Sequence, residues 1–569
     1  MNFKKHKVAL FSSLISILII FSSCTSLQKP PDLNTPPSFA KFDQSIPKTE
    51  SPLSSDRISS SSIQKDEIAT REEYPLSLED AIVLTLENNL DIKISNYDSK
   101  ISTYEVEAQK GIYDTSFRAK LLEQQEDEQT STDREKVEKM LPSSSSSFSY
   151  VQQSHTRVAE TAISQLLPSG AWIDLTLNQT RVNFLDSRDS TSYDPFYTQT
   201  AGLSVTQPLL KGFGKTVTNA GINISRINKN ITTLQLKKKV MDQITEVLKT
   251  YWDLVFSIEN LEVQKISLKQ AEDLLRINTI KYESGALPST DVLQAKAQVA
   301  AREEQVLIAK SLITTYQDRL KQLMNIPEGS EKWLVSLTPK DSPIKKPVEV
   351  NEAKCLKEAM ALHPDIISAK KAIEIAEINL KTAKNMKQPE LNIFGSYGYS
   401  GKGNEREDAF DNLTTYDYVD WQLGLEFKYP FLNRQARYKY YQSEIWVKKA
   451  ETQLKNVKNL IALAVRDAIR SVNTNLQRTD ITKTGIQFEE AKLAAEQNRF
   501  DVGKSTSFNI LTFQQDLALA KVHHLSAVID YNKALVDLEQ AKGTILDTLK
   551  IKIEESPEED SYLKSIFKK

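Results

Sequence analysis

The fold of this chain is decided by the stretch KYESGALPSTDVLQAKAQVA at residues 281–300, which returns at residues 499–521 as RFDVGKSTSFNILTFQQDLALAK. Each copy follows a very long helical pattern and precedes another. A lone glycine, Gly285 or Gly503, lies shortly after an aromatic residue, which is typical of a helix that ends in the left-handed region. Ser289 and Thr290, like residues 505–507, then offer side-chain oxygens to the first turn of a new helix. Each copy therefore predicts the tight tip of a helical hairpin.

The chain around these tips is also repeated. Amphipathic helical stretches occur at residues 76–112, broken at 88–89, and at 350–386, broken at 363–364. The segment GLSVTQPLL at 202–210 corresponds to GLEFKYPFL at 424–432. Matching residues are 274 apart in the first helix (Asp91 and Asp365) and 222 apart in this segment (Gly202 and Gly424). The pattern predicts two copies of one unit, with about 52 extra residues within 118–200 of the first copy.

The period of the pattern changes within each unit. At 421–429 apolar and aromatic residues alternate with polar ones, and weaker alternation occurs at 391–397 and 203–206. This alternation is typical of membrane barrel strands, but also of half-buried soluble sheets. Apolar residues then recur at coiled-coil spacing for roughly 65 to 70 residues. The return paths are about half as long, so we expect helices 290–325 and 351–386 to lie end to end, like 505–549 and 76–112, with an irregular proline-rich joint at 327–347.

Composition and the N-terminus limit the function. The 569 residues carry a net charge of −2, which argues against nucleic acid as a partner. Three lysines, an apolar run at 8–21 and Ser-Ser-Cys24 resemble a lipoprotein signal whose Cys24 is lipidated, the alternative being an ordinary signal peptide. Residues 25–73 are rich in Ser and Pro and predict a disordered tether. Cys355, the other cysteine, is expected to be a small buried apolar residue.

Over about residues 76–549 the chain resembles the TolC family of outer membrane efflux channels. The resemblance rests on five motifs in the family's order: LEDAIVLTLENNLDI, TQPLLKGFG, YESGALPSTDVLQA, PELNIFGSYG and RFDVGKSTSFNILTFQQDLA. It implies an α+β membrane protein, in which a homotrimeric outer membrane β-barrel with four strands per chain is continued by a long periplasmic α-helical coiled-coil barrel. An open group of four strands cannot remain in a bilayer, because its edges leave backbone groups unsatisfied.

This resemblance implies a passive exit duct of a tripartite efflux pump or a type I secretion system. A periplasmic adaptor (membrane fusion protein) would open it and link it to an inner membrane pump or ABC exporter. The sequence contains no enzyme motif and no Walker loop, and its five histidines lack metal-ligand spacing, so we expect no enzyme activity, no cofactor and no metal. The alternative is a periplasmic coiled-coil structural lipoprotein without a pore, held by outer membrane lipid at Cys24. Aromatic residues at the ends of the 421–429 face favour the channel. The cargo has no signature in the sequence.

The gate of the family corresponds to this chain only in part. Thr290 and Asp291 stand where the family has a Thr-Asp pair after the first-tip glycine, here Gly285. In the second tip the family has a tyrosine before the glycine, here Gly503, an arginine after it and two aspartates one turn apart. The corresponding residues here are Phe500, Ser505, Asn509 and Thr512, and Lys504 is a candidate substitute for the arginine. The resemblance implies a weakly locked gate without an acidic ring, or residues that only pack the tip.

The expected organisation is a signal peptide (1–24), a tether (25–73), a first repeat (74–349, tip 282–291), a second repeat (350–550, tip 500–509) and a flexible tail (551–569). Within the insertion, residues 123–150 predict a disordered extracellular loop. Pro168-Ser169-Gly170 and the alternation at 173–177 predict an added hairpin, with residues 156–165 as its weaker strand. Because Arg157 and Glu160 interrupt that strand's apolar face, we expect the hairpin to extend above the membrane and leave a twelve-stranded barrel unchanged.

Overall fold

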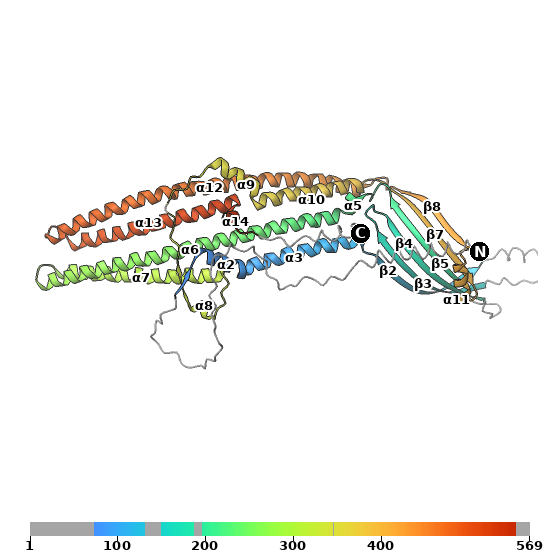
Figure 1. The fold of residues 1–569 in the computed structure, drawn as a ribbon, viewed down its shortest axis with the longest axis horizontal. Coiled ribbons are helices and arrows are strands. Elements are labelled where there is room, and N and C mark those ends of the chain that lie inside the picture. The colour runs from blue at the N-terminus through green and yellow to red at the C-terminus, as the bar shows by residue number, and fades with distance from the viewer. Residues whose placement is uncertain (1–72, 131–149, 187–195, 345, 553–569) are drawn as a thin grey trace, which may run out of the picture. The chain divides into compact units, whose positions relative to one another are not determined.

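The computed structural model describes residues 73–130, 150–186, 196–344 and 346–552 (Figure 1). The described residues form two compact units. The sheet unit comprises residues 103–228 and 373–449, and the helical unit comprises residues 73–102, 229–372 and 450–552. Segments from both predicted repeats contribute to each unit.

The helices confirm the expected hairpins. α6 (Ala220–Glu283, 64 residues) is followed by α7 (Ser289–Leu323, 35 residues), and α12 (Arg434–Asp501, 68 residues) by α13 (Ser507–Lys542, 36 residues). Figure 1 shows each pair running side by side up to its tip. Among the helices in the described part of the chain, none combines the length and the apolar composition needed to cross a membrane.

Both predicted helix breaks are present. α2 (Leu78–Asn88) and α3 (Leu90–Lys110) are separated at Asn89, and α9 (Glu352–Leu362) and α10 (Pro364–Met386) at His363. At each break the intervening side chain accepts a hydrogen bond from the first turn of the second helix. The Ile92 amide donates to Asn89 Oδ1 at 3.1 Å, and the Asp365 amide donates to His363 Nδ1 at 3.2 Å. These side chains therefore cap the helix that follows each bend.

The proline-rich joint is more regular than expected. β1 (Glu73–Leu76) pairs in parallel with β6 (Ser336–Pro339), after the short helix α8 (Glu331–Leu334). The fully buried Tyr251 of α6 holds this joint, because its hydroxyl bonds Leu76 O at 3.1 Å and Asp341 Oδ2 at 2.9 Å. Cys355 is a free, buried thiol on α9, as predicted. The chain's last described helix is α14 (Ile545–Thr548).

The sheet unit contains one antiparallel sheet of six strands, not the four expected. Its order is β2-β3-β4-β5-β7-β8. The bounds are β2 Ser116–Thr130, β3 Tyr150–Leu166, β4 Trp172–Asp186, β5 Phe196–Pro208, β7 Glu390–Gly403 and β8 Val419–Lys428. The short helices are η1 Gly111–Tyr113, α5 Lys215–Thr218 and α11 Arg406–Thr414. Residues 123–130 of the predicted loop are thus part of β2, and residues 131–149 lie outside the described residues.

The added hairpin β3–β4 lies within the sheet and does not extend beyond it, so that expectation was wrong. Its turn lies at the end of the sheet where β5 ends, because the Gly214 amide donates to Ser169 O at 3.0 Å. Gly170 has a φ of +91°, and a Cβ there would lie 2.5 Å from Gly212 O. The hairpin therefore starts level with the neighbouring strands and runs alongside them.

Register explains why Arg157 and Glu160 do not interrupt one face. They are three residues apart, so their side chains point to opposite sides of β3. Arg157 forms an ion pair with Glu123 at 2.8 Å at the far end of the face that carries Phe117 and Leu121, and Glu160 pairs with Arg118 on the opposite face. Each charge is neutralised by the adjacent strand β2, which the alternation in the sequence did not locate. Because these partners on β2 were not included in the prediction from the sequence, the fit of β3 to the sheet was underestimated.

Candidate functional site

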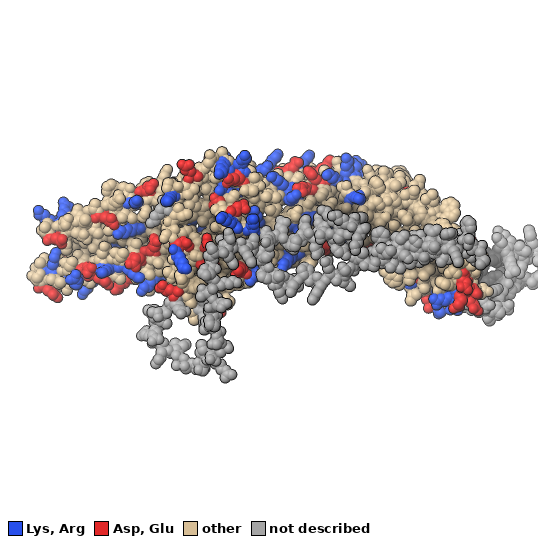
Figure 2. Space-filling model, in the orientation of Figure 1, with Lys and Arg blue, Asp and Glu red and all other residues tan. Residues whose placement is uncertain are grey.

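One side of the six-stranded sheet is apolar and exposed. Directly paired residues share a face, so the registers assign every strand position to one of two sides. The first side, here called the apolar face, carries Phe117, Leu121, Leu177, Val205, Ile393, Tyr397, Trp421, Leu423, Leu425 and Phe427. Trp421 is 74% exposed and Phe427 66%. Figure 2 shows a broad area over this sheet without charged side chains. An exposed apolar patch of this kind marks a lipid or protein interface.

The apolar residues follow a diagonal band across the sheet. One register row joins Phe117, Ile163, Leu175, Leu203, Tyr397 and Trp421. The apolar stretch of β8 (419–427) is centred two residues from this row along the strand. The apolar stretch of β2 (117–121) is also centred two residues from the row, but in the opposite direction along the sheet. Four residues along a strand over five strand spacings correspond to a tilt of about 30°. Membrane barrel strands are tilted by roughly 35–45°, so the band resembles a level belt around tilted strands.

The opposite side of the sheet, here called the polar face, carries polar and charged residues. Its members include Arg118, Lys120, Glu160, Asp174, Asn178, Thr200, Ser396, Gln422 and Glu426. The Arg118–Glu160 ion pair lies on this side. A sheet with one exposed apolar side and one charged side suits a boundary between lipid and water.

The sheet has two unpaired edges. β2 and β8 are its outermost strands, and each is hydrogen-bonded to a neighbour on one side only. The edge strands are 15 and 10 residues long. Unpaired backbone groups on such strands pair readily with another strand.

The two helical tips have the same backbone geometry. Gly285 has a φ of +78° and donates to Tyr282 O, while the Ala286 amide donates to Lys281 O at 2.8 Å. Gly503 has a φ of +70°, with equivalent bonds from Gly503 and Lys504 to the preceding helix. The left-handed helix end is therefore confirmed. Side-chain capping of the next helix was wrong, because Pro288 and Thr506 occupy the N-cap positions and neither makes a side-chain cap bond.

Phe500 belongs to a small apolar group to which both hairpins contribute. This group, here called the tip cluster, consists of Leu274, Phe500, Ile510 and Leu511, all at most 7% exposed. Leu274 belongs to α6 and the others to α12 and α13, so the cluster joins the hairpins. The Lys281 ammonium also lies 4.0 Å from the centroid of the Phe500 ring.

Glu496 organises the second tip, although no sequence motif identified it. It is 7% exposed and accepts hydrogen bonds from Ser505 Oγ at 2.6 Å and Asn509 Nδ2 at 3.1 Å. Arg499 NH1 lies 3.5 Å from its other oxygen. The Ser505 hydroxyl, with Asn509 and Arg499, lowers the pKa of the Glu496 carboxyl below its ordinary value. Ser505 and Asn509 are thus held together through a third residue, nine and thirteen positions from it.

The remaining predicted site residues are more dispersed. Thr290 is exposed, and Asp291 contributes its backbone carbonyl to Asn278 Nδ2 at 3.4 Å. Thr512 is half-buried and its hydroxyl bonds Phe508 O at 2.9 Å. The Lys504 side chain is exposed, so its role as a substitute for the arginine stays a prediction. Cys24 lies outside the described residues.

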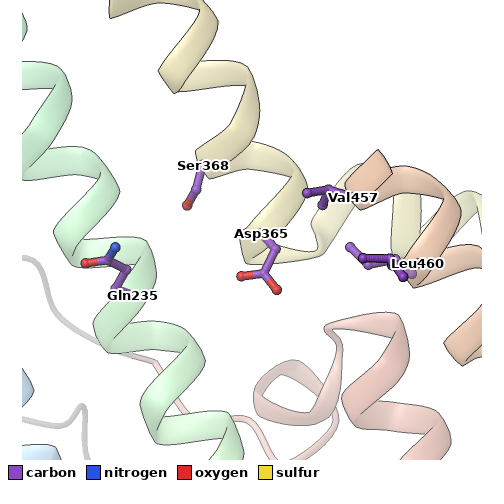
Figure 3. A pocket seen from close by; sticks show the side chains of 6 residues that line it. Gln235, Asp365, Ser368, Val457 and Leu460 are labelled. Atoms are coloured by element: carbon purple, nitrogen blue, oxygen red, sulfur yellow. The ribbon is translucent and has the colours of Figure 1, made fainter. Parts of the chain in front are cut away.

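Apart from these surfaces, the helical unit contains a hollow between α6, α10 and α12. Figure 3 shows Asp365 of α10 between Gln235 of α6 and the apolar side chains Val457 and Leu460 of α12. Its volume is about 280 Å³. Asp365 is already paired with Lys238 at 2.7 Å. In the described residues no group of three or more His, Cys, Asp or Glu side chains is arranged to hold a metal ion. We therefore assign no ligand to this hollow.

Together, an open sheet with an apolar and a polar side and long helical hairpins with tight turns at their tips are the features of outer membrane channel proteins. The chain belongs to the outer membrane efflux protein family, whose profile matches residues 159–325 and 355–544.

Individual relatives are distant. The outer membrane protein TolC of Vibrio cholerae is 24% identical over 311 residues, which cover 53% of this chain and 68% of that protein. A membrane protein from Pseudomonas aeruginosa has a similar fold, with a TM-score of 0.60, 13% identity and 82% and 90% of the two chains covered. The Campylobacter jejuni CmeC outer membrane channel is also similar in fold, with a TM-score of 0.58 and 16% sequence identity. The match covers 86% of this chain and 89% of that chain.

Proposed function

We propose that this protein is an outer membrane channel that serves as a passive exit duct for an efflux pump or a type I secretion system. The observation that carries the proposal is the sheet with an exposed apolar face, a charged opposite face and two unpaired edges. A bilayer accepts such a sheet only when it closes on itself, because each unsatisfied backbone group in hydrocarbon costs several kcal/mol. The alternative considered from the sequence, a structural lipoprotein without a pore, does not explain this face, because its sheet would expose these apolar side chains to water.

Closure requires further copies of the chain, and we infer a homotrimer. Three six-stranded sheets joined at their β2 and β8 edges form a barrel of eighteen strands, wider than the twelve-stranded barrel expected from the sequence. A barrel of this size leaves an aqueous lumen, here lined by the polar face. The helices support assembly as well. Leu90, Ile94, Tyr97 and Ile101 of α3 are 49–58% exposed and spaced four and three residues apart, which is the spacing of a helix-packing seam.

The helical hairpins would form the periplasmic part of the duct. In this proposal the chain is internally duplicated, with a repeat boundary near residues 349–350, and each repeat supplies one hairpin. The two tips, at 282–291 and 500–509, would meet a periplasmic adaptor, which links the duct to an inner membrane pump or ABC exporter. The duct itself performs no chemistry, so the energy for export comes from that partner. Cys24 would carry a lipid in the outer membrane.

The proposal is tested with the purified full-length protein in planar lipid bilayers. Discrete single-channel conductance, together with a trimeric mass in mild detergent, is the expected result. A folded monomer in detergent that gives no conductance would refute the channel and favour the structural lipoprotein.

The barrel size is tested separately with paired cysteines at the two sheet edges. If three sheets close as proposed, cysteines in β2 and β8 should form disulfides between copies and yield a covalent trimer. A pair placed across β3 and β4, which are neighbours within one chain, should cross-link without increasing the mass and serves as the control.

A further inference from the structure

The connection between β7 and β8 contains a helix that packs on the apolar face. α11 contacts β7 and β5, and its residues Ala409 and Leu413 are 0% and 6% exposed. Two glycines of β7 make room for it. A Cβ on Gly401 would lie 2.2 Å from Ala409 O and 2.3 Å from Leu413 N, and a Cβ on Gly403 only 2.5 Å from Asp408 Cβ. The helix backbone therefore lies directly against the sheet, which only glycine permits.

Polar contacts fix the helix in this position. The buried Gln199 of β5 donates from Nε2 to Arg406 O at 3.3 Å, and Asn412 Nδ2 donates to Lys402 O at 2.7 Å. Tyr416, just after the helix, packs edge-on against Tyr399 with ring centroids 4.9 Å apart. Gln199 and Tyr399 belong to the same side of the sheet as Tyr397 and Trp421. The helix is thus a built feature of the apolar face.

The height of α11 follows from the register. The apolar stretch of β8 runs from Val419 to Phe427, which is about 27 Å along the strand. With the tilt of about 30° given by the diagonal apolar band, this corresponds to roughly 23 Å of height, close to the apolar band of about 25 Å in membrane barrels. Gly401 lies two residues beyond Tyr399, the residue paired with Val419. The helix therefore begins where the apolar band ends.

The outward side of α11 has a mixed character that suits this level. Phe410 is 52% exposed, and the neighbouring Tyr418 is 61% exposed. The charged residues Arg406, Glu407, Asp408 and Asp411 are exposed as well. Figure 2 shows this charged group beyond the uncharged area of the sheet. Charged side chains cannot enter hydrocarbon at acceptable cost, whereas aromatic rings favour the interface.

We propose that α11 is a membrane-interface collar, which contacts the lipid headgroup layer of the leaflet next to the β7–β8 connection and sets the depth of the sheet in the bilayer. The proposal rests on the lipid contact of the apolar face proposed above. Lipid is favoured over a second copy as the occupant because α11 packs on β5 and β7, not on the edge strands β2 and β8, and because its exposed side combines an aromatic ring with charged groups, as the headgroup layer requires. The helix is held from behind, so its outward side is free to meet headgroups.

Depth-dependent fluorescence quenching tests the collar. Phe410→Cys and Leu423→Cys are labelled with bimane in the full-length protein, with the unsubstituted protein as the background control for its own cysteines. Liposomes contain lipids that carry a spin label either at the headgroup or deep in the acyl chain. The Phe410 site should be quenched at least twofold more by the headgroup label than by the deep label, and the Leu423 site should show the reverse order.

The possible failures are distinguishable. Deep quenching at Leu423 with no lipid quenching at Phe410 would overturn the collar and leave the channel intact. If aqueous iodide also fails to quench Phe410, protein covers the helix instead of lipid. Absence of lipid quenching at both sites would overturn the membrane contact of the apolar face itself.

A matched pair of glycine substitutions tests the role in depth. Gly401→Ala should displace α11, so the Phe410 site should lose its headgroup preference and the quenching depth at Leu423 should shift. Gly202→Ala on the neighbouring strand β5 is the control, because a Cβ there meets nothing closer than 3.7 Å and does not contact Leu423. An unchanged Leu423 depth in Gly401→Ala, with Phe410 displaced, would overturn the depth-setting role.

Discussion

Removal of the Phe500 side chain should loosen both tips while the rest of the chain stays folded. Phe500 is 7% exposed and contacts Leu274, Ile510 and Leu511, so Phe500→Ala leaves a cavity within a cluster of only four buried residues. Replacing a buried phenylalanine with alanine typically costs about 3–5 kcal/mol. Loss of the Lys281 contact with the ring adds about 0.5–1 kcal/mol.

This cost should appear as local opening. The tip cluster is separate from the three larger clusters around residues such as Tyr251, Ile244 and Val465, so its loss leaves those cores unchanged. A decrease of about 3 kcal/mol in the free energy of local opening corresponds to roughly 150-fold faster amide exchange. In bilayers, the same loosening should raise the resting conductance of the channel.

Hydrogen exchange measured residue by residue provides the assay. Amides at 274–283 and 500–511 should exchange about two orders of magnitude faster in Phe500→Ala, and amides around Tyr251 should not change. Phe508→Ala is the matched control, because Phe508 lies on the same tip but is 57% exposed. Equal effects in both variants, or protected tips in Phe500→Ala, would refute the assignment of Phe500 as the contact between the hairpins.

Further predictions concern the second tip and the joint. The pKa of Glu496 is lowered in the folded chain, so its stabilisation is present above the ordinary glutamate pKa and is lost as the pH falls through the lowered value; tip exchange should accelerate in acid, and Glu496→Gln should abolish that dependence. Asn509→Asp should loosen the tip, because it places a second carboxylate against Glu496. Thr512→Asp should raise the cation preference of the channel, measured by reversal potential, without accelerating amide exchange at the tip. Faster tip exchange in Thr512→Asp but not in Asn509→Asp would contradict this hydrogen-bond network. Burial raises the pKa of Tyr251 to about 12, so its stabilisation of about 2–3 kcal/mol is complete below pH 10 and is lost as the pH rises through 12. Tyr251→Phe should lower the melting temperature at pH 8 and should remove this loss of stability in alkali. The same alkaline loss in Tyr251→Phe as in the unsubstituted protein would contradict this assignment.

The sequence by itself determined the helical part of the protein. Helix ends and breaks depend on residues within a few positions of each other, such as Gly285, Gly503 and Asn89, and these local signals placed the hairpins and bends correctly. The alternation at 421–429 likewise identified β8, because a strand's two faces can be read from its own residues. The family resemblance then supplied the architecture and the function class.

Only the tertiary structure decided how many strands the sheet contains and which residues hold the tip. β2 is highly polar, and its role depends on pairing with β3, where Glu123 and Arg118 neutralise Arg157 and Glu160. Glu496 is bonded to Ser505 across the turn, and α11 depends on glycines that are unremarkable in the sequence. These features rest on contacts between residues brought together by folding, and single-sequence periodicity carries no information about which partner each residue meets.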